Sequence, residues 1–238
     1  MNGIIGISGV VALLIVTGGV LGVLRPRTLS LRWLLVAALL VVVNDVMLTG
    51  AYGRVPNLLP DSGWNWQGKV LALAATLLIA SLPLFGWRHA GLTLTQAAGS
   101  LKAAIPVALL YIAFFVGIAW VFPSEPATAE TVAFQLTMPG LEEELFYRGI
   151  LLFALDRAFL DRKLFLGVEW GWGAVLSCAL FGLAHAFGFS DGPFSFDPLT
   201  MALTAVPSFI AVWLVLKTRS VLLPVALHNF GNAITLLI

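Results

Sequence analysis

Three apolar stretches in the second half of the chain carry polar side chains that could do chemistry. A carboxylate can accept a proton, an imidazole can accept or donate one, and an amide can donate a hydrogen bond to developing negative charge. The groups are Glu142, Glu143 and Glu144 with Arg148, then Phe181 with His185, then His228 with Asn232. These residue types are suited to proton transfer, to ion pairing or to metal binding.

Helical spacing places several of these side chains on shared faces. Glu144 and Arg148 are four residues apart and can pair along one face, whereas Glu143 points about 100° away. Phe181 and His185 share a face for the same reason, as do His228 and Asn232. One carboxylate is therefore expected to be neutralised locally, and its neighbour Glu143 is left available.

Each of these residues also has a structural interpretation. An ionisable side chain in the middle of a membrane costs roughly 2.5–3.5 kcal/mol, so it needs a partner or a function. Taken singly, each histidine fits a hydrogen-bonded contact, Glu144 with Arg148 an ion pair, and Glu142 an interfacial or helix-terminus charge. Asn44 and Asp45 are expected to form a polar contact between helices. Taken jointly, Glu143, His185, His228 and Asn232 favour a function.

The composition places these groups in a membrane. Hydrophobic residues make up 60% of the 238 residues and charged residues only 11%, outside the range of soluble proteins. A net charge of +1 and the absence of a basic run exclude nucleic acid as a partner. The single cysteine, Cys178, cannot form an internal disulfide, and it is expected to be a small core residue rather than a thiolate partner of His185.

Eight apolar stretches are each about as long as the ~20 residues that cross a bilayer. We therefore predict an all-α, polytopic transmembrane helical bundle with about eight spans. The fifth span contains the three glutamates, and its helix is expected to begin upstream, near Thr128. The predicted spans are 3–24, 33–51, 70–87, 103–122, 136–156, 171–189, 200–216 and 220–238.

Positive charge alternates from loop to loop and predicts the topology. Cations concentrate in the first, third, fifth and seventh loops, whereas the other loops hold Arg54 and Lys69 among several acids. By the positive-inside bias, the cation-rich loops are cytoplasmic and both termini are outside. The cations of the rich loops are Arg25, Arg27, Arg32, Arg88, Lys102, Arg157, Arg162, Lys163, Lys217 and Arg219.

The three motifs together resemble the CPBP (Abi) family of intramembrane proteases, which includes the type II CAAX prenyl proteases. The resemblance rests on Glu-Glu-x-x-x-Arg at 143–148, Phe-x-x-x-His at 181–185 and His-x-x-x-Asn at 228–232, in family order. It covers about residues 137–238. We therefore expect one transmembrane domain, 1–238, with four N-terminal spans in 1–126 and a catalytic core in 127–238. A prokaryotic cell membrane is the expected location.

The resemblance implies an endopeptidase that acts on a membrane-associated or lipidated peptide or protein within the bilayer. Glu143 is expected to activate water, His185 to hold it, and His228 and Asn232 to stabilise the oxyanion, with Glu144 and Arg148 in support. This mechanism requires no cofactor. In the alternative, Glu143, His185 and His228 bind Zn²⁺, although the sequence has no His-Glu-x-x-His helix.

Two other classes of protein compete with this interpretation. Intramembrane carboxylates and histidines also form proton relays, so a proton-coupled transporter is one rival, although the sequence has no internal repeat. A non-catalytic membrane scaffold of the same fold is the other. Measured peptide cleavage distinguishes the protease from both.

Overall fold

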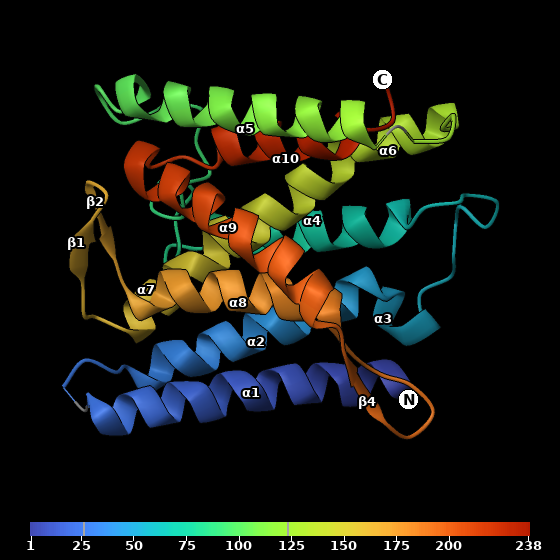
Figure 1. The fold of residues 1–238 in the computed structure, drawn as a ribbon. Coiled ribbons are helices and arrows are strands. Elements are labelled where there is room, and N and C mark those ends of the chain that lie inside the picture. Colours follow the sequence, from blue (N-terminus) through green and yellow to red (C-terminus); the bar gives the residue numbers. More distant parts are fainter. Residues whose placement is uncertain (26, 123) are drawn as a thin grey trace.

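The chain is mostly helical in a computed structural model that describes residues 1–25, 27–122 and 124–238. Most helices lie along one common direction (Figure 1). In chain order they are α1 (Asn2–Leu24), α2 (Leu31–Leu48), α3 (Gly50–Gly53), α4 (Trp66–Ser81), α5 (Leu101–Val121), α6 (Ala129–Pro139), the π-helix η1 (Gly140–Leu151), α7 (Leu152–Ala158), α8 (Trp172–Ala186), α9 (Pro198–Thr218) and α10 (Leu222–Ile234).

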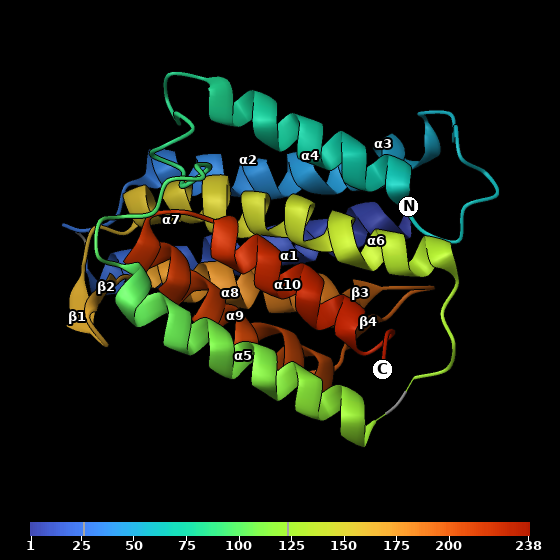
Figure 2. The same cartoon turned by 90° about the horizontal axis from the view of Figure 1, so that it is seen from above.

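A continuous rod formed by α6, η1 and α7 runs through the middle of the bundle. The rod is contacted by α2, α4, α8 and α10. Helices α1 and α5 lie at opposite edges in Figure 1, and α4 and α5 lie at opposite edges in the view from above (Figure 2). Phe146, Ile150, Leu151 and Leu155 of the rod are almost completely buried. The fifth predicted span is therefore the centre of the fold, and its expected start near Thr128 is confirmed, because α6 begins at Ala129.

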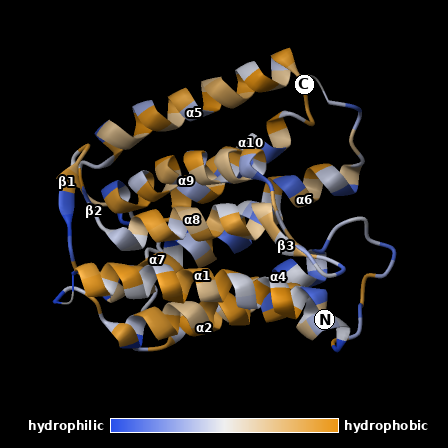
Figure 3. Cartoon of the chain, turned by 60° about the horizontal axis from the view of Figure 1, so that its bottom comes forward, coloured by the Kyte–Doolittle hydropathy of each residue, from blue (hydrophilic) through white to orange (hydrophobic). Residues whose placement is uncertain are grey.

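Hydrophobic residues predominate along most helices (Figure 3), and many of their large apolar side chains are exposed. Among the described residues, α1, α2, α5 and α9 are the four helices that are long and apolar enough to cross a membrane. The shorter apolar helices α4 and α8 lie at two more of the predicted spans. The helical class is confirmed, whereas the number of eight spans is not and remains a prediction.

Polar side chains cap the N-termini of α4, α6 and α9. The Asn65 side chain accepts a hydrogen bond from Gly68 N–H at the start of α4, and Thr128 accepts one from Thr131 N–H before α6. Asp197 accepts hydrogen bonds from two backbone N–H groups at the start of α9. Such caps satisfy donors that a helix leaves free at its N-terminus.

Two short hairpins correct the expectation of an all-helical chain. Strands β1 (Lys163–Phe165) and β2 (Val168–Trp170) pair antiparallel, as do β3 (Phe187–Phe189) and β4 (Phe194–Phe196). The predicted span 171–189 therefore ends too late, because its helix stops at Ala186. The segments Phe-Gly-Phe and Phe-Ser-Phe alternate aromatic and small residues, which is a strand pattern. They flank a turn in which Asp191 and Gly192 have positive φ, so the chain forms a hairpin here instead of continuing the helix.

The backbone changes helical register at the junction of α6 and η1. Pro139 has no N–H to donate, and the next N–H, of Gly140, donates to Asn229 Oδ1 of α10 at 2.7 Å. Twelve residues of π-helix follow, with hydrogen bonds that span five residues instead of four. This stretch carries all three glutamates, so the wider turn sets where their side chains point.

Candidate active site

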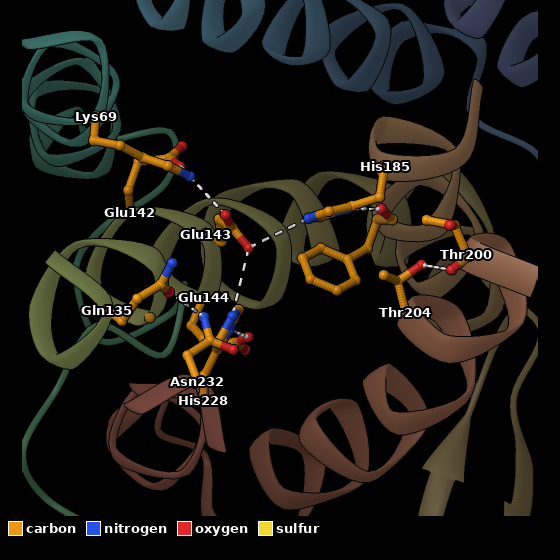
Figure 4. Close-up of polar contacts among 12 residues, drawn as sticks. Lys69, Gln135, Glu142, Glu143, Glu144, His185, Thr200, Thr204, His228 and Asn232 are labelled. Carbon is orange, nitrogen blue, oxygen red and sulfur yellow. Dashed lines mark hydrogen bonds and ion pairs between the residues drawn. The ribbon is translucent and has the colours of Figure 1, made fainter. Parts of the chain in front are cut away.

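The polar residues of the three motifs surround one cavity of about 590 Å³. Its walls come from the rod, from the start of α4 and the segment before it, and from α5, α8, α9 and α10. All six residues that the sequence indicated, Glu143, Glu144, Arg148, His185, His228 and Asn232, line this cavity. Side chains from three distant stretches of chain are therefore brought together, as Figure 4 shows.

Glu143 has two carboxylate oxygens in different surroundings. Its Oε1 accepts a hydrogen bond from Lys69 Nζ at 2.6 Å. Its Oε2 is buried without a hydrogen-bond partner among the described residues, 4.0 Å from His185 Nε2 and 3.7 Å from His228 Nε2. These separations are too long for direct hydrogen bonds, and they allow a water oxygen about 2.8 Å from each atom.

The second ring nitrogen of each histidine is fixed by a hydrogen bond. His185 Nδ1 lies 2.8 Å from Phe181 O, and His228 Nδ1 lies 2.7 Å from Glu144 Oε1. A carbonyl and a carboxylate only accept hydrogen bonds, so each Nδ1 carries the proton. Both Nε2 atoms therefore face Glu143 Oε2, and each presents a lone pair in the neutral imidazole.

A buried ion pair holds His228 in place. Glu144 Oε2 lies 3.2 Å from Arg148 Nε, so the pair expected from their spacing is confirmed. The Arg148 guanidinium lies 4.0 Å from the centroid of the Phe181 ring, which packs against His185. Because Glu144 binds both Arg148 and His228, this network links the rod to α8 and α10.

Asn232 faces the same cavity from α10 and is itself oriented. Its Nδ2 donates a hydrogen bond to Gln135 Oε1 of α6 at 3.0 Å, and its second N–H remains for another acceptor. The neighbouring Asn229 points away and binds Gly140 N–H. The two asparagines thus have different functions on one helix.

Two polar partners at the site, Lys69 and Gln135, are absent from the sequence prediction, and a third, Asn44, was expected only as a contact between helices. Lys69, assigned to a loop, lies in the first turn of α4, where its ammonium is 2.6 Å from both Glu142 Oε2 and Glu143 Oε1. Asn44 donates to Glu142 Oε1 at 2.7 Å, so its expected contact between helices is confirmed. Glu142, expected to be an interfacial or helix-terminus charge, lies in the first turn of η1 and is completely buried against Asn44 of α2 and Lys69 of α4.

The arrangement does not form a ready metal site. Within the described ranges, no group of three or more His, Cys, Asp or Glu side chains is placed to hold a metal ion. The Lys69 ammonium on Glu143 Oε1 would also repel a divalent cation at that carboxylate. The zinc alternative therefore gains no support from the geometry.

Cys178 and Asp45 lie outside the polar group at the cavity. Cys178 is completely buried in an apolar cluster with Leu152 and Val212, which agrees with its expected structural role. Asp45 accepts a hydrogen bond from Tyr52 at 2.5 Å, so it joins α2 to α3 rather than to a distant helix.

The four long apolar helices, together with the family match that follows, indicate an integral membrane protein. Residues 125–234 match the family described as type II CAAX prenyl endopeptidase Rce1-like, so the resemblance to this protease family is confirmed over those residues. The match contains all three motifs. No significant match was found among curated proteins or among solved structures.

Proposed function

We propose that this protein is an intramembrane endopeptidase that hydrolyses a peptide bond of a membrane-associated or lipid-anchored substrate. The observation that carries the proposal is the position of Glu143 Oε2, which is buried, has no hydrogen-bond partner among the described residues and faces two imidazole Nε2 atoms. The family match over residues 125–234 supports the same class of reaction.

In the proposed reaction, Glu143 Oε2 takes a proton from a water molecule that His185 Nε2 helps to orient. The water oxygen forms a bond with the carbonyl carbon, and the carbonyl oxygen becomes an oxyanion. The free N–H of Asn232, and the Nε2–H of His228 when this ring is protonated, donate to that oxyanion. Protonated Glu143 then gives its proton to the amide nitrogen, and the C–N bond breaks to yield a carboxylate and an amine.

The supporting residues act on orientation. Lys69 binds Oε1 of Glu143 and so directs Oε2 toward the histidines. Glu144, held by Arg148, keeps His228 Nδ1 protonated and its ring fixed. Mostly apolar residues of α5 and α9, including Phe115, Leu203, Pro207 and Leu214, line the opposite wall and would accept an apolar substrate segment.

We further propose that the cavity lies nearer the outer face of a prokaryotic cell membrane. Both termini lie at the same end of the bundle, and Lys69 and His185 lie near that end, opposite the cation-rich loop between α1 and α2 (Figure 1). By the positive-inside bias, the termini are then outside. A reporter enzyme that is active only outside the cytoplasm should be active when fused after Ile238. A stable but inactive fusion would contradict this orientation and place the C-terminal end of the chain in the cytoplasm.

The experiment that tests the function is cleavage by the purified protein in lipid vesicles that contain membrane-anchored and lipidated peptides. We expect discrete cleavage products by mass spectrometry, and we expect cleavage to continue in a zinc chelator because the proposed mechanism uses no metal. Cleavage that stops in chelator and returns with zinc would contradict the metal-free mechanism. Proton-coupled uptake without cleavage would favour a transporter. The absence of both cleavage and uptake would favour a scaffold.

A further inference from the structure

A second cavity, of about 270 Å³, lies at the end of the bundle opposite the termini (Figure 1). It is bounded by the loop after α4, by α7 and by the end of α9. Five basic side chains line it: Arg88, His89, Arg157 and Arg219 from these three segments, and Arg162 from the segment after α7. Asp156 is the acidic side chain among the described lining residues. Arg148 also borders the cavity, but it is paired with Glu144.

The five basic side chains are not equally engaged by the protein. Arg162 lies 3.4 Å from Asp156, and Arg157 stacks on the Phe153 ring at 3.7 Å. Arg88 and Arg219 are exposed, and within the described ranges their guanidinium groups have neither a hydrogen bond nor an ion pair. The cavity thus presents the guanidinium groups of Arg88 and Arg219 without a direct ion pair, although the charge of Arg219 also acts on the Asp156 carboxylate.

The backbone around these two arginines is held by hydrogen bonds. Gly91 N–H donates to Arg88 O at 3.2 Å, and Val221 N–H donates to Gly91 O at 2.9 Å, which ties the loop after α4 to the start of α10. Arg219 ends α9 in the left-handed conformation, with its N–H on Val215 O. The backbone positions from which the two guanidinium groups extend are therefore fixed.

The positive-inside bias accounts for the number of basic residues at this end, but it does not require them to converge on a cavity. Converging like charges repel each other, and a bound anion relieves that repulsion. Next to Arg88, the side chains of Leu82, Leu84 and Trp87 are 50%, 44% and 44% exposed, and they offer an apolar surface for acyl chains. A ligand with an anionic head and apolar tails fits both features.

We propose that this cavity binds the phosphate headgroup of an anionic phospholipid, with Arg88 and Arg219 as its principal ligands. A guanidinium can donate two parallel hydrogen bonds to phosphate oxygens. Basic pockets between membrane helices are suited to anionic headgroups. The proposal is independent of the peptidase proposal, because its two ligands, Arg88 and Arg219, do not line the cavity that contains Glu143.

The test is lipid binding to the purified protein in neutral detergent, measured by native mass spectrometry. Phosphatidylglycerol should bind and phosphatidylcholine should not. Arg88→Gln and Arg219→Asn should each weaken binding about fivefold, as expected for one arginine near an anionic lipid. Asparagine tolerates the left-handed conformation at 219. Arg32→Gln is the matched control, because Arg32 is exposed at the same end but does not line the cavity, and it should bind normally.

Three outcomes would overturn the proposal. They are equal binding of phosphatidylcholine, an equal loss of binding in Arg32→Gln, and inorganic phosphate that binds as tightly as the lipid. The last outcome would identify a free-anion site instead. The comparison of the two lipids on the unchanged protein does not depend on whether a variant folds.

Discussion

Replacement of Glu143 by glutamine should abolish most of the cleavage and leave the fold intact. Glutamine has nearly the same shape and can still accept a hydrogen bond from Lys69, but it cannot take a proton from water. Loss of a general base lowers the rate by about 10²–10⁴-fold. We therefore expect kcat to fall by this factor in the vesicle assay, and a membrane-linked precursor to accumulate in cells that carry the variant.

The matched control for Glu143→Gln is Glu169→Gln. Glu169 is exposed in β2, at the opposite end of the bundle from Lys69 and His185 (Figure 1). This control should cleave at the normal rate and show no accumulated precursor in comparative proteomics. A well-folded Glu143→Gln protein that cleaves as fast as Glu169→Gln would remove Glu143 from its proposed catalytic role.

Replacement of Lys69 by methionine should cause the largest loss of stability. Its ammonium is 2.6 Å from both Glu142 and Glu143, and Glu142 is completely buried. Removal of one partner of a buried ion pair leaves an uncompensated charge and costs about 3–5 kcal/mol. We expect the free energy of unfolding, measured in mixed detergent micelles, to fall by about this amount.

Two further variants separate the ion pair from the lost packing of the side chain. Lys102→Met removes an exposed lysine from α5 and should leave the free energy of unfolding unchanged. Lys69→Met combined with Glu142→Gln removes the buried charge together with its partner, so it should recover part of the loss. A Lys69→Met protein as stable as Lys102→Met would show that the contacts of Lys69 contribute nothing to the fold.

The sequence predicted the residues of the site better than it predicted their partners. Helical spacing placed Glu144 with Arg148 correctly, and the cost of burying Glu143, His185 and His228 indicated that they would meet. Spacing along one helix does not say which helix lies beside it, so the contact of Lys69 with Glu142 and Glu143 was missed. A single lysine at the start of an apolar stretch was the available signal.

The fold shows the same difference between local and long-range information. Apolar runs located the long helices, while the hairpin after His185 was mistaken for the end of a helix despite the Asp191-Gly192 turn signal. The π-helix begins where Gly140 N–H binds Asn229, which is 89 residues away in the chain. Pro139 is the local sign of this change of helical register, and the contact with Asn229 has no local sign.

The most direct test of the central claim is cleavage in water enriched in ¹⁸O. If Glu143 activates a water molecule that attacks the peptide carbonyl, one ¹⁸O atom enters the new C-terminal carboxylate of the product, and Glu143→Gln yields almost none of this labelled product. A cleavage product without ¹⁸O, or labelled product formed at the same rate by Glu143→Gln, would contradict the account.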